Sequence, residues 1–242
     1  MIKRYLVLFL LLLAAAATYG QSAPKRVKHA PKRVKQPHDV VAAYRVCAEF
    51  QRLLAENLDF DRAFEATFVK NPSRRRQVAI AESEHGDRDL AQVDTDTVVG
   101  SFKDQAQLII LLLPVIFAGG EDDQAKMFPA PIKAIFERKP PNDPQEFQAY
   151  AAQLKRDVTG FRAHFDKLAA NNPAVAKNIE EYKKYLLTPL KPPNRIVQPM
   201  TAYSRGGVLR LDEEYYRIDQ CAVIREDGQM RLIGYTFFTL RF

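Results

Sequence analysis

The amino-acid sequence predicts an α+β fold, in which a mainly helical body is followed by a small C-terminal antiparallel β-sheet of three to four strands. Apolar residues recur at steps of three and four along residues 39–188, which is the periodicity of amphipathic helices. From residue 195 to residue 242 the periodicity is close to two, as in β-strands. A sheet this small needs helices packed on it, so we expect residues 39–242 to form a single globular domain.

The first 20 residues have the pattern of a secretory signal peptide. Lys3 and Arg4 precede an apolar block, Leu6–Leu13, and mostly small residues follow up to Gly20. This pattern predicts an exported protein that is periplasmic or secreted. The alternative is a membrane anchor formed by an uncleaved N-terminal segment, although a membrane-spanning helix needs about 20 apolar residues and this block is shorter.

Residues 21–38 form a basic tail with a tandem heptapeptide, in which Ala-Pro-Lys-Arg-Val-Lys-His is followed by Ala-Pro-Lys-Arg-Val-Lys-Gln. The repeat has too little apolar surface to fold by itself. Its basic residues are Lys25, Arg26, Lys28, Lys32, Arg33 and Lys35. The tail is therefore either a spacer or a means of electrostatic adhesion to an anionic membrane or envelope surface.

The formal net charge of +7 belongs to this N-terminal region rather than to the domain. Residues 1–36 contain eight of the 36 Lys and Arg and no acidic residue, which leaves 28 basic residues beside 29 acidic ones in the rest of the chain. A nearly neutral domain lacks the basic face that nucleic-acid binding requires. We therefore expect no specific nucleic-acid binding.

The first predicted helix of the body has Asp39 as its N-cap, and the second begins at Asp59 or Asp61. The third, from Ser73 to about Glu84, opens with three arginines at positions 74–76. Positive charges are unfavourable at a helix N-terminus, so we expect these arginines to find acidic partners elsewhere.

Two later helices dominate the predicted core. Leu108–Phe117 is apolar on all sides, which predicts a buried helix that is kinked or ended at Pro114. Asp143 is the expected N-cap of a long helix from Pro144 to about Ala170. We expect this helix to lie across the C-terminal sheet and to bury one apolar stripe, formed by Phe147, Tyr150, Leu154, Val158, Phe161, Phe165 and Leu168.

Two hairpins are expected after the linker at Pro192 and Pro193. The first joins residues 195–203 to residues 207–211. The second joins residues 215–225 to residues 229–242 through Asp227 and Gly228, the strongest two-residue turn signal.

Cys47 and Cys221 are the only cysteines, and export would allow them to form a disulfide. Such a bond would close a loop of about 175 residues and tie the first helix to a late strand. The alternative is a pair of buried thiols.

Motifs for catalysis, for cofactors and for metals are absent from the sequence, so we identify no catalytic residue and expect no cofactor. Glu82 and His85 have the spacing of helical carboxylate metal sites, but no second copy of the motif exists. An acidic loop without the EF-hand spacing is expected to be solvated; it contains Asp87, Asp89, Asp94 and Asp96. His164 is expected to be exposed, opposite the apolar stripe of its helix.

The aromatic residues of the long helix and the sheet predict either a helix–sheet core or a cleft for an apolar ligand or protein partner. These residues are Phe147, Tyr150, Phe161, Phe165, Tyr215, Tyr216, Tyr235, Phe237 and Phe238. The leading functional hypothesis is an exported, non-catalytic binding or interaction protein of the cell envelope. The alternatives are an exported hydrolase-type enzyme with a site at the helix–sheet junction and a structural or assembly subunit that offers a sheet edge.

Overall fold

The chain divides into two units, Met1–Lys35 and Gln36–Phe242. A computed structural model describes the following parts of the second unit: residues 38–82, 90–116, 138, 140–190, 194–196, 200–204, 207–211 and 215–235. The expected signal peptide, residues 1–20, and residues 21–37 of the expected basic tail lie outside the described residues. His38, expected to be the last residue of the tail, is instead the first residue of helix α2 (His38–Asn57).

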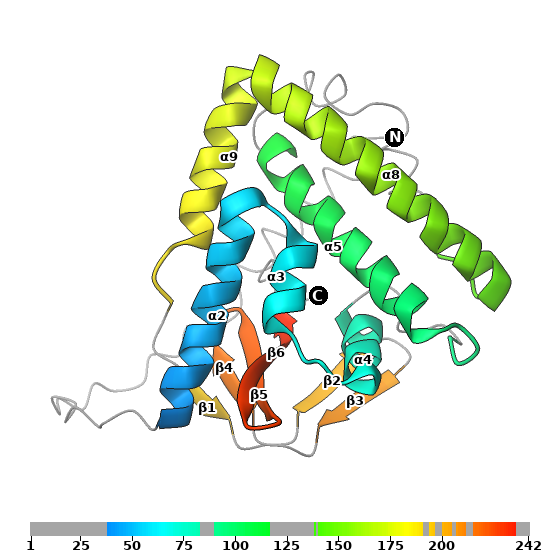
Figure 1. The fold of residues 1–242 in the computed structure, drawn as a ribbon, viewed down its shortest axis with the longest axis vertical. Coiled ribbons are helices and arrows are strands. Elements are labelled where there is room, and N and C mark those ends of the chain that lie inside the picture. The colour runs from blue at the N-terminus through cyan, green and yellow to red at the C-terminus, as the bar shows by residue number, and fades with distance from the viewer. Residues whose placement is uncertain are drawn as a thin grey trace, which may run out of the picture. The chain divides into compact units, whose positions relative to one another are not determined.

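The second unit has the predicted α+β fold (Figure 1). Its described helices are α2 (His38–Asn57), α3 (Phe60–Thr67), α4 (Pro72–Glu82), α5 (Thr95–Ile116), α8 (Pro144–Asn171) and α9 (Pro173–Leu186). An antiparallel sheet follows, with the order β1 (Asn194–Ile196), β4 (Tyr215–Ile218), β5 (Cys221–Glu226) and β6 (Gln229–Tyr235). A separate hairpin pairs β2 (Met200–Ser204) with β3 (Gly207–Leu211).

Side-chain caps start several of these helices, as the sequence predicts. Asp59 accepts a hydrogen bond from the backbone N–H of Arg62 at the start of α3. Asp143 does the same for the first turn of α8, where Pro144 is the first helical residue. Asp39, in contrast, is not an N-cap, because it lies inside the first turn of α2, where its charge still favours the helix dipole.

The apolar helix α5 continues through Pro114 to Ile116. The predicted burial is confirmed for Leu108 and for Ile110 to Val115, which are buried, whereas Ile109 is 37% exposed. Within the described residues, Thr95–Val115 is also long and apolar enough to cross a membrane. Two thirds (67%) of its most apolar window is buried inside the protein, as in the core helix of a folded domain.

The strand prediction for residues 215–225 is wrong, because this segment is two strands rather than one. β4 ends at Ile218, the chain turns at Asp219 and Gln220, and β5 begins at Cys221. Asp219 adopts a left-handed backbone conformation with φ of 49°, which a short polar side chain tolerates. No glycine marks this turn, so the alternation of apolar residues continues through it and hides it.

The predicted partner of the long helix is also wrong. Helix α8 buries its stripe up to Phe165, but it packs along α5 and against α9, and the sheet is covered by α2 with α4 against β6 (Figure 1). The apolar circumference of α5 needs cover on several sides, and α8 supplies one of them. The sheet is covered by the apolar face of α2, which includes Val40, Ala43, Cys47, Phe50 and Leu54.

A disulfide joins Cys47 of α2 to Cys221 at the start of β5, which is the pairing expected from the sequence. The two Cα atoms lie 6.0 Å apart, within the range that a disulfide requires. Both residues are fully buried, so the bond lies in the core between the first helix and the sheet.

Candidate functional site

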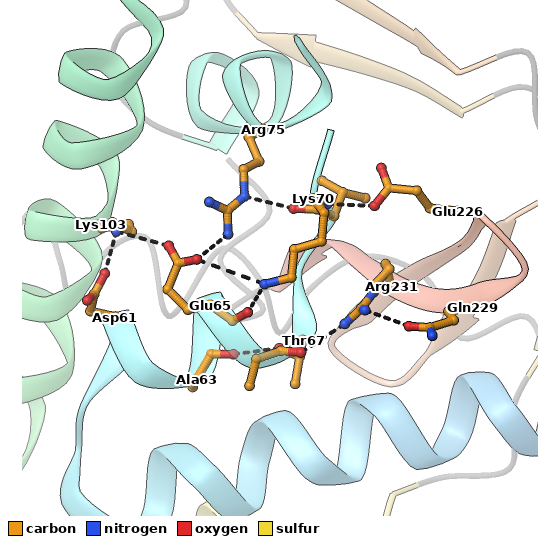
Figure 2. Close-up of polar contacts among 12 residues, drawn as sticks. Asp61, Ala63, Glu65, Thr67, Lys70, Arg75, Lys103, Glu226, Gln229 and Arg231 are labelled. Carbon is orange, nitrogen blue, oxygen red and sulfur yellow. Dashed lines mark hydrogen bonds and ion pairs between the residues drawn. The ribbon is translucent and has the colours of Figure 1, made fainter. Parts of the chain in front are cut away.

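A dense group of charged residues surrounds Glu65 of α3, and we call it the Glu65 cluster (Figure 2). Four segments contribute to it: α3, the α3–α4 connection with α4, α5, and the β5–β6 hairpin. Its members are Asp61, Glu65, Lys70, Arg75, Lys103, Glu226, Gln229 and Arg231. Asp61 and Glu65 are four residues apart and therefore share one face of α3.

Glu65 is the centre of this cluster. The Nη2 atom of Arg75 lies 2.7 Å from Glu65 Oε2, and Lys103 Nζ lies 3.2 Å from Oε1. Lys103 also forms an ion pair with Asp61. Arg75 Nε donates a hydrogen bond to the carbonyl oxygen of Val69 at 2.8 Å, so the guanidinium joins the carboxylate to the backbone beyond α3.

The charges of the cluster stabilise one another. Burial opposes ionisation of Glu65, but hydrogen bonds from Arg75 and Lys103 outweigh it and hold the Glu65 pKa below its ordinary value. Burial likewise opposes the charge of Lys103, but hydrogen bonds to Asp61 and Glu65 raise its pKa. Both cations also approach the ring of Phe64. A carboxylate held ionised in this way suits a structural clamp better than a general acid, which must carry a proton near neutral pH.

The hairpin half of the cluster contacts backbone groups of the α3–α4 region. Glu226 is 7% exposed, and its carboxylate accepts hydrogen bonds from the backbone N–H of Lys70 at 2.5 Å and of Asn71 at 3.3 Å. Arg231 Nη1 donates to the carbonyl oxygen of Ala66 at 2.9 Å. The cluster therefore ties the β5–β6 hairpin to the end of α3.

Part of this cluster follows from the run of arginines at positions 74–76. Arg75 finds the acidic partner that the sequence predicts, namely Glu65. Arg76 has no acidic partner among the described residues, and its guanidinium donates instead to the carbonyl oxygens of Val93, at 2.7 Å, and Leu90. The sequence gives no indication of Glu226, whose role depends on the way the hairpin folds back onto the α3–α4 connection.

An open groove lies beside this cluster, between α2 and the β5–β6 hairpin, and we call it the α2–hairpin groove. Its volume is about 410 Å³, near the lower end for small-molecule sites. Helix α2 lines one wall, the hairpin lines the other, and the end of α3 closes one side. The lining residues are His38, Ala42, Arg45, Val46, Glu49, Ala66, Thr67, Arg225, Gly228, Gln229 and Met230.

The charges around the α2–hairpin groove are unevenly paired. Glu49 is held by the guanidinium of Arg52, with contacts of 2.7 and 2.9 Å. Arg225 pairs with Asp39. Arg45, exposed on the same wall, has no ion pair with any residue that the structure describes. The groove therefore presents a partly apolar surface with Arg45 on its rim, a positive charge that no described residue neutralises.

Asp104 of α5 is the carboxyl with the largest raised pKa among the described residues. Burial raises its pKa to about 6, while Lys155 and Lys103 lower it and Asp61 raises it. A raised carboxyl pKa is a feature of many catalytic sites, although structural carboxyls show it as well. Asp104 lies on α5 and not at the helix–sheet junction where the sequence analysis expected an enzymatic site.

The metal-site candidates gain no support from the described residues. Asp94 is the N-cap of α5, where it accepts a hydrogen bond from the backbone N–H of Thr97 at 2.8 Å. The side chains of Glu82 and His85, and the acidic residues Asp87 and Asp89, lie outside the described residues. Within the described part of the chain, no three His, Cys, Asp or Glu side chains are grouped to hold a metal ion.

The prediction that His164 is exposed is wrong. Its ring stacks on Phe161, with the centroids 6.5 Å apart, and its Nε2 atom is buried without a hydrogen-bond partner among the described residues. Helix α8 contacts both α5 and α9, so its covered surface is not limited to one side of the helix.

Most of the aromatic candidates lie in the core rather than in a cleft. The buried ones are Phe147, Tyr150, Phe161, Phe165, Tyr216 and Tyr235. Tyr215 is partly buried and packs against the same core, and Phe237 and Phe238 lie outside the described residues. The six basic tail residues, from Lys25 to Lys35, also lie outside them.

Comparison with protein-family models, with curated proteins and with solved structures finds no match to this chain. Its function is therefore inferred from its own residues.

Proposed function

We propose that this protein is an exported, non-catalytic binding module of the cell envelope, held at an anionic surface by its basic tail. The observation that carries the proposal is the separation of charge along the chain. Six basic residues and no acidic residue lie between Lys25 and Lys35, whereas the rest of the mature chain has nearly equal numbers of both. Basic residues near an anionic membrane each contribute about 1 kcal/mol to binding.

The body supports a binding role in two ways. The charged side chains of the Glu65 cluster form ion pairs with one another and hydrogen bonds with backbone groups. They therefore stabilise the fold and are not directed at a substrate. The α2–hairpin groove, by contrast, is open and partly apolar, which suits a ligand or partner better than an acid–base mechanism.

A hydrolase-type enzyme is the second candidate, and the raised pKa of Asp104 is the observation in its favour. If the protein is a hydrolase that uses Asp104, Asp104→Asn should abolish its hydrolytic activity. If it is a binding module, the same substitution should change only its stability.

An assembly subunit that offers a sheet edge has less support. The outer edge of β6 is engaged within the chain, because the backbone N–H of Val69 donates to the carbonyl oxygen of Leu232 at 3.0 Å. At the other edge of this sheet, β1 has only three residues, Asn194–Ile196. Short or covered edges disfavour the addition of a partner strand.

Co-sedimentation with vesicles tests the proposal. The purified protein should bind vesicles made of equal parts phosphatidylcholine and phosphatidylglycerol, and high salt should release it. Changing the six basic tail residues to Gln should remove most of this binding. Binding that persists in this variant, or that survives high salt, would contradict electrostatic adhesion by the tail.

Two controls accompany this experiment. A chain that begins at Pro37 should keep the melting temperature of the longer protein, because the tail is expected to be separate from the fold. N-terminal sequencing of the protein isolated from cells distinguishes cleavage near residue 20 from a retained membrane anchor.

A further inference from the structure

We propose that the α2–hairpin groove is a second contact with the same surface: it takes one acyl chain of an anionic membrane phospholipid, whose phosphate binds Arg45. This inference rests on the proposed function, because the tail would bring the domain to the membrane.

The first argument is the position of the groove along the chain. His38 lines the groove and is joined directly to Pro37, and only Gln36 and Pro37 separate it from Lys35, the last basic residue of the tail. A chain spans at most about 3.6 Å per residue, so the Cα atom of Lys35 lies within about 11 Å of that of His38. The first turns of α2 are therefore within reach of a surface that the tail binds.

The second argument is the chemistry of the groove. Its apolar lining includes Ala42 and Val46 on α2, which are partly exposed, and Met230 on the hairpin, which is 8% exposed. One turn before Arg45, Val41 is 38% exposed, which adds an accessible apolar side chain to the same end of α2. An apolar surface next to a cation matches an acyl chain with an anionic headgroup, as in helices that lie in the membrane interface.

The third argument is charge complementarity. The acidic residues beside the groove are already engaged, Glu49 with Arg52 and Asp39 with Arg225. Arg45 has no counter-charge among the described residues, and its guanidinium can form two parallel hydrogen bonds to a phosphate. The groove thus offers a phosphate one arginine whose charge no described carboxylate neutralises.

The absence of tryptophan from the chain allows a direct test. Val41→Trp places a single fluorophore on α2 next to the groove, one turn before Arg45, and Ala152→Trp, at an exposed site on α8, is the matched control. With the anionic vesicles described above, emission from Val41→Trp should shift to the blue and be quenched by phospholipids brominated on the acyl chain. The control should show neither effect.

The charge is tested by Arg45→Gln, which should weaken vesicle binding about fivefold, corresponding to the loss of one cation at the membrane surface. The control is Arg156→Gln, because Arg156 is an exposed helical arginine that hydrogen-bonds Gln153 and has no ion pair within the described residues. Its loss should leave binding unchanged, and both variants should keep the melting temperature of the parent protein.

The outcomes separate this inference from the proposed function. In one outcome, neutralising the tail removes vesicle binding, Arg45→Gln binds as well as its control Arg156→Gln, and the emission of Val41→Trp does not change with lipid. The groove is then not a lipid site, and the tail acts alone. If binding depends on Arg45 but not on the tail, the lipid site stands and adhesion by the tail fails. If Val41→Trp emission shifts with protein concentration in the absence of lipid, a second copy of the chain covers the groove, which overturns the inference.

Discussion

The α2–sheet contact and the α5–α8 contact are held together by different kinds of interaction. Helix α2 is linked to the sheet by a disulfide, by the ion pair between Asp39 and Arg225, and by apolar packing. Helix α8 packs on α5 through its apolar stripe, and the Gln105 side chain donates a hydrogen bond to the hydroxyl of Tyr150 at 3.5 Å.

The difference teaches how the two contacts are specified. A disulfide and an ion pair each require one particular partner residue, whereas an apolar stripe can pack against any apolar surface of suitable shape. Particular pairs of residues therefore specify the packing of α2 on the sheet. Helix α8 packs on α5 because α2 already covers the sheet, while the apolar surface of α5 still needs cover.

The largest expected effect is on the α2–sheet contact. Replacing Cys47 and Cys221 together by Ser should lower the free energy of unfolding by about 5 kcal/mol, because the chain-entropy model assigns about this value to a loop of some 170 residues. Denaturant unfolding of the variant and the oxidised parent measures the difference. Equal stabilities would show that the two half-cystines are not bonded in the native protein.

On the α5–α8 side, Phe161→Ala should lower the free energy of unfolding by about 3 to 5 kcal/mol, since the residue is 2% exposed and its loss leaves a cavity. Thr159→Ala, on the exposed face of the same helix, is the control and should change little. If both variants were equally stable, α8 would not be a core helix. Chemical unfolding curves for the pair decide between the two outcomes.

The elements of the fold could be predicted because their signals are local. Asp143 and Pro144 start α8, and Asp227 and Gly228, with φ of 48° and 78°, form the turn between β5 and β6. The turn at Asp219 was missed because it lacks such a signal. The packing of α8 was missed because periodicity shows which face of a helix is buried but not what covers it.

The candidate site could be predicted only in part, for the same reason. The positive charge of Arg75 near a helix N-terminus indicated that this side chain needs an acidic partner, and Glu65 is that partner. The groove beside Arg45 has no sequence signature, since its two walls are about 180 residues apart and meet only when α2 docks on the sheet. Position 164 shows the converse, because a face of α8 that looks polar in the sequence is half-buried in the folded domain.

The contact between α5 and α8 is mainly apolar, so the carboxyl of Asp104 on α5 should weaken this contact when it is ionised. Its pKa is raised to about 6 from an ordinary value of 3.8, so the folded state binds the proton more tightly than the unfolded state. The resulting stability is fully present below pH 3.8 and is lost as the pH rises through 6.

Asp104→Asn should therefore increase the free energy of unfolding at pH 7 by about 1 to 2 kcal/mol, a value reduced for solvent screening of a partly exposed group. Below pH 3.8 the variant and the parent should be equally stable. Unfolding curves recorded across this pH range would reject the prediction if the variant were less stable at pH 7.

The smallest expected effect concerns Glu65, which connects the two regions, since it binds Arg75 on the sheet-facing helix α4 and Lys103 on α5. Glu65→Gln keeps the shape of the side chain but removes the charge, so it should cost about 1 kcal/mol at pH 7. Glu181→Gln is the matched control, because Glu181 forms a single exposed ion pair with Lys177 at 3.8 Å and its loss should be nearly neutral.

The pH dependence identifies the cause of the Glu65 effect. Its pKa is lowered in the folded state, so the stability it contributes is present above the unfolded-state pKa near 4.5 and is lost as the pH falls through the lower, folded-state value. The difference between Glu65→Gln and the parent should accordingly shrink at acidic pH, whereas a difference caused by altered packing would remain. High salt should reduce it only in part, because Arg75 and Lys103 are themselves mostly shielded from solvent. A Glu65 effect that disappears completely in high salt as well as in acid would mean that the cluster acts through long-range surface charge, and α4 and α5 would then be joined by their apolar contacts alone.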